Sequence, residues 1–370
     1  MKYKLKDIFD LQMGKTPSRN NQDYWNTDEN KWISIADLSK NEKYIKETKE
    51  CLSDDAVRES GIKIIPANTV VMSFKLSIGK TAITAEDMYS NEAIMAFHDK
   101  HVVELLPEYI FYMFKYKNWD EGTNKAVMGR TLNKATLAEI EIEICSIEKQ
   151  RKIVEVLNKM MNVLLGRKNE LQLLDNLIKA RFVEMFGDEN NSKNWNMVKI
   201  EDVANVQVGV VIKPSQYYTD KENGVKAFRS LNIGEGFIKD IDWVYFTKEG
   251  HQKNSKSILK ENDLLIVRSG APGTSCIVTK KYEGCNAIDI IIAHPNCDKV
   301  NSYYLCTFTN MPHGKRQIDE GTGGAAQQHF NIGKYNKLQL ILPPIELQNQ
   351  FADFVVQVDK SKFVDVLMVV

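Results

Sequence analysis

The sequence contains two copies of one pattern, about 195 residues apart. The segment LKDIFDLQMG, which begins at Leu5, returns as IEDVANVQVG, which begins at Ile200. A second segment, EIEIEICSIE from Glu139, returns as KLQLILPPIE from Lys337. This period is about the length of a whole domain and far exceeds the roughly 50-residue units of repeat solenoids. The chain is therefore expected to contain two related modules that differ in their middles and agree at their edges.

The composition indicates a globular protein. A chain of 370 residues with 43% hydrophobic residues can build two cores. Six cysteines form no C-x-x-C pair and no secretory signal precedes the first repeat, so we expect a reducing, cytoplasmic location. No apolar run approaches the roughly 18 residues of a membrane helix. Because the formal net charge is zero, any contact with nucleic acid has to come from local patches of charge.

Short β-type runs, broken by Gly, Asn and Pro, predict a mixed α/β (α+β) fold for each module. One helix is predicted in the first module, from Pro107 to Trp119, with Pro at its start. The predicted modules span residues 1–146 and 188–344. Their strand-like runs are 32–35, 69–73 and 139–144 in the first module, and 263–267, 287–293 and 338–342 in the second.

Residues 147–187 predict one long central helix, because they contain no Pro and end in the helix-stopping Gly187. Apolar residues recur there with heptad spacing, which is typical of a coiled-coil seam. A helix of about 40 residues is about 60 Å long, too long to bury its seam on one small domain, so it needs a partner helix. The seam residues are Ile153, Leu157, Met160, Leu164, Leu171, Leu174, Ile178 and Met185.

A second helix is predicted at 345–370, beginning at the position equivalent to the start of the first. It is shorter than the first helix and ends in the apolar residues 366–370. We therefore expect the seam between Gln172 and Phe186 to lack part of its partner, so that Leu174 and Ile178 are incompletely covered.

The sequence shows no motif for catalysis. Residues 78–81 resemble the end of a phosphate-binding loop, but Phe74 stands where that motif requires Gly, which favours a polar turn. The Pro-Pro pair at 343–344 lacks the polar residue expected in adenine methyltransferases, which favours a helix entry. The six histidines have no metal-ligand spacing, and no nucleophile has a local signature. A binding protein without a catalytic or metal site is therefore favoured over an enzyme.

Three regions in each module carry cations and small polar residues but no acidic ones: 11–22, 70–85 and 123–138, then 203–219, 264–282 and 321–337. Such cations can neutralise phosphates, and Arg, Lys, Gln and Asn can read base edges. Their recurrence in both modules favours DNA contacts over ordinary solvated loops. The candidate DNA-binding residues are Lys15, Arg19, Lys75, Lys80, Lys125, Arg130, Lys134, Lys213, Arg229, Arg268, Gln327, Gln328 and His329.

This layout resembles the specificity subunit of type I restriction–modification systems. The shared features are the opening L-x-D-I motif with its later Gly at Leu5 and Ile200, the strand that runs into I-E-x-Q at Ile147 and Ile345, and the long helix ending at Gly187. None of them is diagnostic alone. Their doubled order at this spacing is specific, and it covers nearly the whole chain.

The resemblance implies two target-recognition domains, each reading half of a split, asymmetric DNA site. It also implies that the long helices pack antiparallel as a coiled-coil spacer, which sets the distance between half-sites. The partners implied are double-stranded DNA, two modification (methyltransferase) subunits and restriction subunits. S-adenosylmethionine, ATP and Mg would bind to those subunits, which would flip the target base. This chain itself would bind no cofactor and catalyse nothing.

Two other functions stay open from the residues alone. An enzyme that modifies or cleaves DNA through an unrecognised active site would act on DNA without partners. A coiled-coil adaptor that binds only proteins would show no salt-dependent affinity for DNA. The repeated basic regions favour DNA binding over the adaptor.

Overall fold

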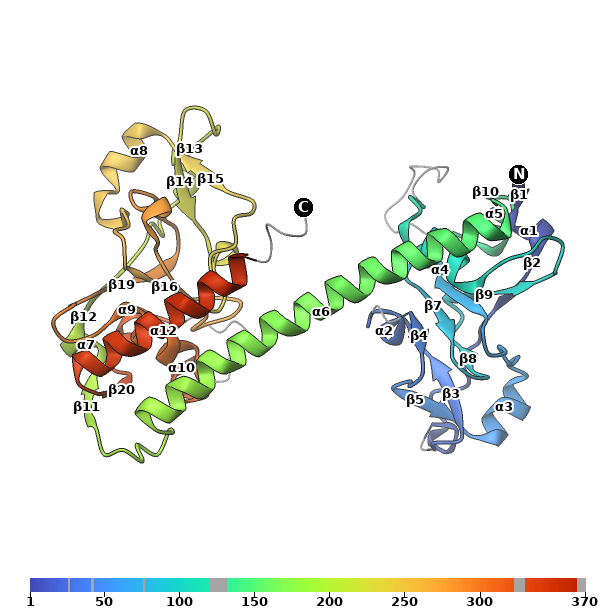
Figure 1. Cartoon of the computed structure of the whole chain (residues 1–370), viewed down its shortest axis with the longest axis horizontal. Helices are drawn as coiled ribbons and strands as arrows, with labels where there is room; N and C mark the ends of the chain where they lie inside the picture. The colour runs from blue at the N-terminus through green and yellow to red at the C-terminus, as the bar shows by residue number, and fades with distance from the viewer. Residues whose placement is uncertain (26, 41–42, 76, 120–131, 323–329, 365–370) are drawn as a thin grey trace. The chain divides into compact units, whose positions relative to one another are not determined.

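The computed structural model describes residues 1–25, 27–40, 43–75, 77–119, 132–322 and 330–364 (Figure 1). The chain divides into two compact units, Met1–Gly166 and Arg167–Val370, which we call the first and the second unit. The division falls inside one long helix, α6 (Ile147–Phe186), rather than at an end of the helix predicted at 147–187. Each unit therefore contains half of α6.

The first unit contains two mixed sheets with strand orders β2-β9-β6-β7-β4 and β5-β3-β8, and β1 pairs with β10. Strands β6 and β7 are buried along their whole length, and the buried hydroxyls of Thr81 and Thr84 in β7 donate to backbone carbonyl oxygens. The elements are β1 (Lys2–Lys4), α1 (Leu5–Ile8), β2 (Phe9–Met13), η1 (Gln22–Tyr24), β3 (Asn30–Ile33), α2 (Ile35–Leu38), β4 (Tyr44–Ile45), β5 (Glu50–Leu52), α3 (Asp54–Ser60), β6 (Val70–Ser73), β7 (Thr81–Thr84), β8 (Tyr89–Ser90), β9 (Ile94–Asp99), α4 (Pro107–Tyr116), α5 (Lys134–Ala138) and β10 (Glu141–Glu143).

Helix α4 closes the core of the first unit against the larger sheet. The Phe97 ring of β9 contacts Phe9 of β2 and Phe114 of α4 edge to face, with ring centroids 5.7 and 4.7 Å apart. The start of α6 packs on the same core through Ile153 and Leu157. Burial and edge-to-face packing of these aromatic rings help to fix α4 on the sheet.

The second unit repeats this plan, with the order β12-β19-β16-β17 corresponding to β2-β9-β6-β7. Its other four-stranded sheet, β13-β15-β14-β18, ends in a parallel pair, as β5-β3-β8 does. This confirms the predicted duplication. The elements are β11 (Asn196–Lys199), α7 (Ile200–Val203), β12 (Ala204–Val208), η2 (Pro214–Tyr217), β13 (Tyr218–Thr219), β14 (Val225–Phe228), η3 (Ser230–Asn232), β15 (Val244–Phe246), α8 (Lys248–Lys253), η4 (Ser255–Ser257), β16 (Leu264–Val267), β17 (Ser275–Ile277), η5 (Lys280–Tyr282), β18 (Asn286–Ala287), β19 (Ile290–Pro295), α9 (Ser302–Asn310), α10 (Pro312–Thr322), α11 (Ile332–Asn336), β20 (Gln339–Leu342) and α12 (Ile345–Val364).

The glycine that closes the first repeated motif has the same role in both units. A Cβ atom at Gly14 would lie 2.2 Å from the carbonyl oxygen of Ser90, and one at Gly209 would lie 2.3 Å from that of Ala287. Two backbones approach so closely here that no side chain fits between them. The repeated Gly is therefore explained by packing.

The glutamine of the I-E-x-Q motif is a buried structural anchor. The Gln150 Oε1 atom accepts a hydrogen bond from the backbone N–H of Leu106 at 3.0 Å. Its Nε2 group donates to the carbonyl oxygens of Glu104 and Cys145 at 2.9 and 3.0 Å. Gln348 makes the equivalent bonds in the second unit. The motif thus joins the start of each long helix to the loop before α4 or α9.

Helices α6 and α12 run side by side in opposite directions within the second unit (Figure 1). The rings of Phe186, at the end of α6, and Phe351, near the start of α12, lie 5.4 Å apart. At the other end of this pair, Arg167 donates a hydrogen bond to the carbonyl oxygen of Lys362 at 2.6 Å. The predicted antiparallel helix pair is therefore present between these residues.

The prediction that Leu174 and Ile178 lack cover is wrong, because the antiparallel direction places the first turns of α12 against the last turns of α6. Ile178 packs on the core of the second unit, and Leu174 is partly buried. The exposed seam residues lie nearer the middle of α6, where Met160 and Leu164 are 55% and 60% exposed. Of the other seam residues, Met185 packs on the core of the second unit and Leu171 is partly buried.

Candidate nucleic-acid interface

The basic regions predicted from the sequence gather at one end of the sheet β2-β9-β6-β7-β4 in the first unit and of the sheet β12-β19-β16-β17 in the second. Strands β2 and β6 both pair antiparallel with β9, so the loops that follow them open at the same end of the sheet. Strands β12, β16 and β19 repeat this arrangement. Two of the three regions in each module are thereby brought together, although about 60 residues separate them in the sequence.

The third region is joined to the same end by one backbone hydrogen bond in each unit. The N–H of Leu132 donates to the carbonyl oxygen of Phe74 at 3.1 Å, and the N–H of Phe330 donates to that of Arg268 at 2.9 Å. Phe74 and Arg268 both directly follow the central strands β6 and β16. All three predicted regions therefore meet at one sheet end.

In the first unit, three predicted lysines lie on this surface with different degrees of restraint. Lys15 is exposed, and its ammonium donates to the carbonyl oxygen of Ser60. Lys80 is partly buried and donates to the Ser39 hydroxyl at 2.6 Å. Lys134, the first residue of α5, is exposed. Exposed ammonium groups on flexible stems can exchange such bonds for phosphate oxygens.

Arg19 is held by a carboxylate and an aromatic ring. Its guanidinium makes two hydrogen bonds to Glu50, at 2.5 and 3.0 Å, and its central carbon lies 3.6 Å from the centroid of the Trp25 ring. The hydrogen bond from Arg19 lowers the pKa of the Glu50 carboxyl. Stacking and bidentate pairing fix the plane of the guanidinium, so Arg19 presents one face to a ligand.

A second carboxylate reaches the same surface from the loop before β9. The hydroxyl of Thr16 donates to Glu92, and this bond lowers the pKa of the Glu92 carboxyl, with Lys75 and Arg19 contributing through charge. The Lys75 ammonium lies 5.4 Å from the Phe74 ring centroid. Regions that are free of acids in the sequence are therefore not free of them in space.

Comparisons with known proteins decide the family. The chain matches the family described as type I restriction modification DNA specificity domain over residues 1–173 and 192–363. The chain belongs to this family. It is 24% identical to the type I restriction enzyme MjaIX specificity subunit of Methanocaldococcus jannaschii, in an alignment of 376 positions that covers 95% of this chain and 85% of that protein.

Two further similarities agree with this membership. The type I restriction enzyme MjaVIII specificity subunit of the same organism is 25% identical over 68% of this chain and 63% of that protein. The crystal structure of a type I restriction-modification system S subunit from M. genitalium superposes with a TM-score of 0.55, at 14% identity, over 98% of this chain and 90% of that one. At this identity the superposition shows a shared fold. In this DNA-recognition family, the two matched segments each contain one of the duplicated sheets.

The second unit uses Arg268 differently from the prediction. Arg268 is buried; its Nε group donates to the carbonyl oxygen of Phe330 at 3.2 Å, and Nη1 pairs with Asp289 at 2.5 Å. In the first unit the equivalent position is the apolar Phe74, which is also buried. The guanidinium thus connects three segments of the fold, and we remove Arg268 from the proposed DNA contacts. No local sequence signal reveals this burial.

The other predicted cations of the second unit differ in how exposed their side chains are. Arg229 is partly buried and donates to the carbonyl oxygen of Asp242, which restricts its reach. Lys213 is exposed, in a left-handed backbone conformation with φ of 43°. The remaining predicted contacts lie outside the described residues: Lys125, Arg130, Gln327, Gln328 and His329.

A cluster of cations and aromatic rings on the second unit was not predicted from the sequence. The rings of Trp243 and Tyr282 stack with centroids 5.6 Å apart, and the Lys226 ammonium lies 4.5 Å from the Trp243 ring. Hydrogen bonds from Lys281 and from the Trp243 indole lower the pKa of Asp240. The pair Lys280–Lys281 lay within a predicted basic region, but Lys226 and Asp240 come from other segments.

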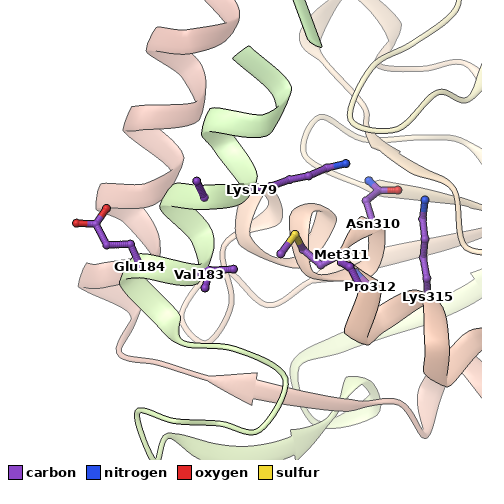
Figure 2. A pocket seen from close by; sticks show the side chains of 8 residues that line it. Lys179, Val183, Glu184, Asn310, Met311, Pro312 and Lys315 are labelled. Carbon is purple, nitrogen blue, oxygen red and sulfur yellow. The ribbon is translucent and has the colours of Figure 1, made fainter. Parts of the chain in front are cut away.

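One cavity of the second unit lies away from these loops. It has a volume of about 680 Å³ and lies between the end of α6 and helices α9 and α10 (Figure 2). Its wall is mostly apolar, with Val183, Met311 and Pro312 beside two lysines, Lys179 and Lys315 (Figure 2). The carboxylate of Glu184, which also belongs to its lining, pairs with Arg181 at 2.7 Å.

Two other classes of site are not found in the part of the chain that the structure describes. There, no three His, Cys, Asp or Glu side chains are grouped so that they could hold a metal ion. Across the same residues, no helix combines the length and apolarity needed to cross a membrane.

Proposed function

We propose that this chain reads a bipartite, asymmetric DNA site, with each unit recognising one half-site. The observation that carries this proposal is the duplicated sheet whose three loop regions meet at one end in both units. Two units of one fold with different loops can read two unrelated short sequences. The exposed Lys15 and Lys134 in the first unit and Lys213 in the second supply cations for phosphate contacts.

The same proposal assigns catalysis to other subunits. Two modification subunits would bind S-adenosylmethionine and methylate adenine in each half-site, and restriction subunits would use ATP and Mg for cleavage. The family membership supports this division of labour. We propose the cytoplasm as the location, where such a complex meets DNA.

Long-read methylome sequencing tests the proposal. Cells that carry this chain together with its modification subunits should gain methylated adenines in one motif made of two short sequences around a fixed unspecified spacer. Cells with the modification subunits alone should not. A continuous motif, or methylation that does not require this chain, would refute the proposal.

The two alternative functions are tested by a simpler assay. The purified chain alone, supplied with Mg²⁺ or S-adenosylmethionine, should neither cleave nor methylate DNA, and turnover would favour an enzyme. DNA affinity that falls steeply with salt is expected from phosphate contacts. A complex with no DNA affinity would favour a protein-binding adaptor.

A further inference from the structure

Two short connections, one in each unit, each carry a single acidic residue. Residues 91–93 join β8 to β9 in the first unit, and their acid is Glu92. Residues 288–289 join β18 to β19 in the second unit, and their acid is Asp289. Both connections lie at the sheet end where the predicted recognition regions meet, because they lead directly into β9 and β19.

Hydrogen bonds show that the two connections are equivalent. The N–H of Gly14 donates to the carbonyl oxygen of Ile94, the first residue of β9, at 3.2 Å. The N–H of Gly209 donates to that of Ile290, the first residue of β19, at 2.9 Å. The carboxylate therefore recurs at one place in the duplicated fold, although the first connection is one residue longer.

The first carboxylate is held by a neighbouring loop. Glu92 is exposed and accepts a hydrogen bond from the hydroxyl of Thr16, in the loop after β2. This bond lowers the pKa of the Glu92 carboxyl, and the charges of Lys75 and Arg19 act in the same direction. Glu92 is thus a charged acceptor at neutral pH, and it lies among cations from two recognition regions.

The second carboxylate is held from inside the unit. The buried guanidinium of Arg268 pairs with Asp289 at 2.5 Å, while 44% of the Asp289 side chain stays exposed. The backbone of Asp289 is in the left-handed region, with φ of 47°. Few residues other than Gly adopt this conformation, and it persists only where the surroundings support it. Different contacts therefore fix the carboxylate in the two units, at the same sheet end.

The chemistry of a carboxylate limits what it can contact on DNA. An ionised carboxylate only accepts hydrogen bonds, and DNA phosphates repel it. Among the groups that bases display in the major groove, the hydrogen-bond donors are the amino groups of cytosine and adenine. Guanine and thymine display the acceptors O6 and O4 at the corresponding place, so a carboxylate opposite them would lack a donor.

We propose that Glu92 and Asp289 each accept a hydrogen bond from the exocyclic amino group of a cytosine or adenine in the major groove, one in each half-site. This inference rests on the proposed function. Each contact excludes guanine and thymine at one position of the site. Thr16 and Arg268 are positioning residues, which hold the two carboxylates without touching a base.

The test removes the charge and keeps the shape. Glu92→Gln places an amide at the same position, and its NH₂ group can donate to a base oxygen. In cells that carry the full chain with its modification subunits, methylome sequencing should show that Glu92→Gln admits guanine or thymine at one position of one half-site. Asp289→Asn should do the same in the other half-site. The control is Glu141→Gln, an exposed position on β10, which should retain the parental motif.

Binding by the purified complex measures the discrimination directly. Duplexes that carry each of the four base pairs at the altered position should show a parental preference of about 5- to 150-fold for an amino-bearing base, the effect of one good base contact. The preferred base, cytosine or adenine, identifies the source of the amino group. Glu92→Gln should lose this preference. Thr16→Val, which keeps the carboxylate, should weaken binding and retain the preference.

The outcomes separate a reading role from a structural one. If Glu92→Gln weakens binding to all four duplexes alike, or leaves the motif unchanged, the inference is overturned, since a carboxylate that only supports the loop acts on every sequence equally. Glu92→Gln decides the matter even if Asp289→Asn fails to fold, because Glu92 is exposed. Absence of bipartite methylation with the parental chain would instead refute the proposed function itself.

Discussion

The side chain of Gln348 accepts a hydrogen bond from the backbone N–H of Asn301 at 2.9 Å. Its Nε2 group donates to the carbonyl oxygen of Pro343 at 2.8 Å. The residue is fully buried, so no water replaces these bonds if the side chain is lost. Gln348 therefore joins three segments of the second unit: the start of α12, the end of β20 and the start of α9.

Replacing this anchor should destabilise the unit that contains it. We expect Gln348→Leu and Gln150→Leu each to lower the free energy of unfolding by about 1–3 kcal/mol, because buried backbone groups lose their partners. Chemical denaturation of the purified chain measures this. The control is Gln172→Leu, an exposed position on α6, which should have little effect. Equal stability of Gln348→Leu and the parental chain would contradict the anchoring role.

The repeated glycines provide a second test of stability. Gly14→Ala and Gly209→Ala should each cost about 1–3 kcal/mol, since the new Cβ overlaps a carbonyl oxygen. Gly166→Ala, in the middle of α6 with nothing within 4 Å of its Cβ position, should instead stabilise by about 0.5–1 kcal/mol. Thermal unfolding distinguishes the destabilisation expected for Gly14→Ala and Gly209→Ala from the stabilisation expected for Gly166→Ala. Matching effects at Gly14 and Gly166 would show that close backbone contact is not the reason for the repeated Gly.

The pair formed by Arg19 and Glu50 should make stability depend on pH. The hydrogen bond from Arg19 lowers the pKa of Glu50 from its ordinary 4.5 in the folded chain. The stabilisation that the Arg19–Glu50 pair gives to the folded chain is therefore present above about pH 4.5. It is lost as the pH falls through the pKa of Glu50 in the folded chain. We expect Arg19→Met to be less stable than the parental chain at pH 7, with the difference shrinking in acid.

Denaturation at a series of pH values measures this difference. The control is Arg58→Met, which breaks the more exposed pair between Arg58 and Asp55. Exposed pairs contribute little, so Arg58→Met should have a smaller effect at pH 7. A difference in the free energy of unfolding between Arg19→Met and the parental chain that stays constant from pH 7 to acid would rule out the Glu50 carboxylate as the source of that difference.

Part of this site follows from the sequence, and part does not. The duplicated ends predicted two related units, because Gly14 and Gln150 make contacts that depend on the backbone and recur with the motif. The charge of the surface was not predictable from acid-free regions, because Glu50 and Glu92 reach it from other segments. The burial of Arg268 was also hidden, since its partner Asp289 precedes a different strand.

The direction of the helix pair shows a further limit of sequence reasoning. Heptad spacing predicted that α6 needs a partner, and it does not specify which turns the partner covers. The contact between Phe186 and Phe351 places the start of α12 against the end of α6. The prediction aligned the two helices at their starts, as if they were parallel, and so placed the uncovered seam at the end of α6. Because the helices are antiparallel, the exposed seam residues lie nearer the middle of α6.

Charge removal at the sheet ends should change the salt dependence of DNA binding. Lys15→Gln and Lys134→Gln should each reduce the slope of log K against log salt by about 1 if the ammonium contacts a phosphate. The half-site sequences should stay the same. Lys168→Gln, at an exposed position on α6, is the control and should leave the slope unchanged. An unchanged slope for Lys15→Gln would remove Lys15 from the interface.

The division of the chain inside α6 permits a direct test of the two-unit account. The first unit ends at Gly166 and the second begins at Arg167, so an insertion between them leaves the packing of each unit intact. Four extra helical residues add about 6 Å, on the order of one to two base-pair steps. Gly166→Ala without an insertion is the control.

Methylome sequencing of cells carrying the insertion variant with its modification subunits is the most direct measurement. If α6 is a spacer between two independent readers, the insertion variant should methylate the same two half-sites, separated by a longer spacer. New half-site sequences at the original spacing would contradict it, because they would mean that the helix takes part in reading bases and does not act only as a spacer between two independent readers.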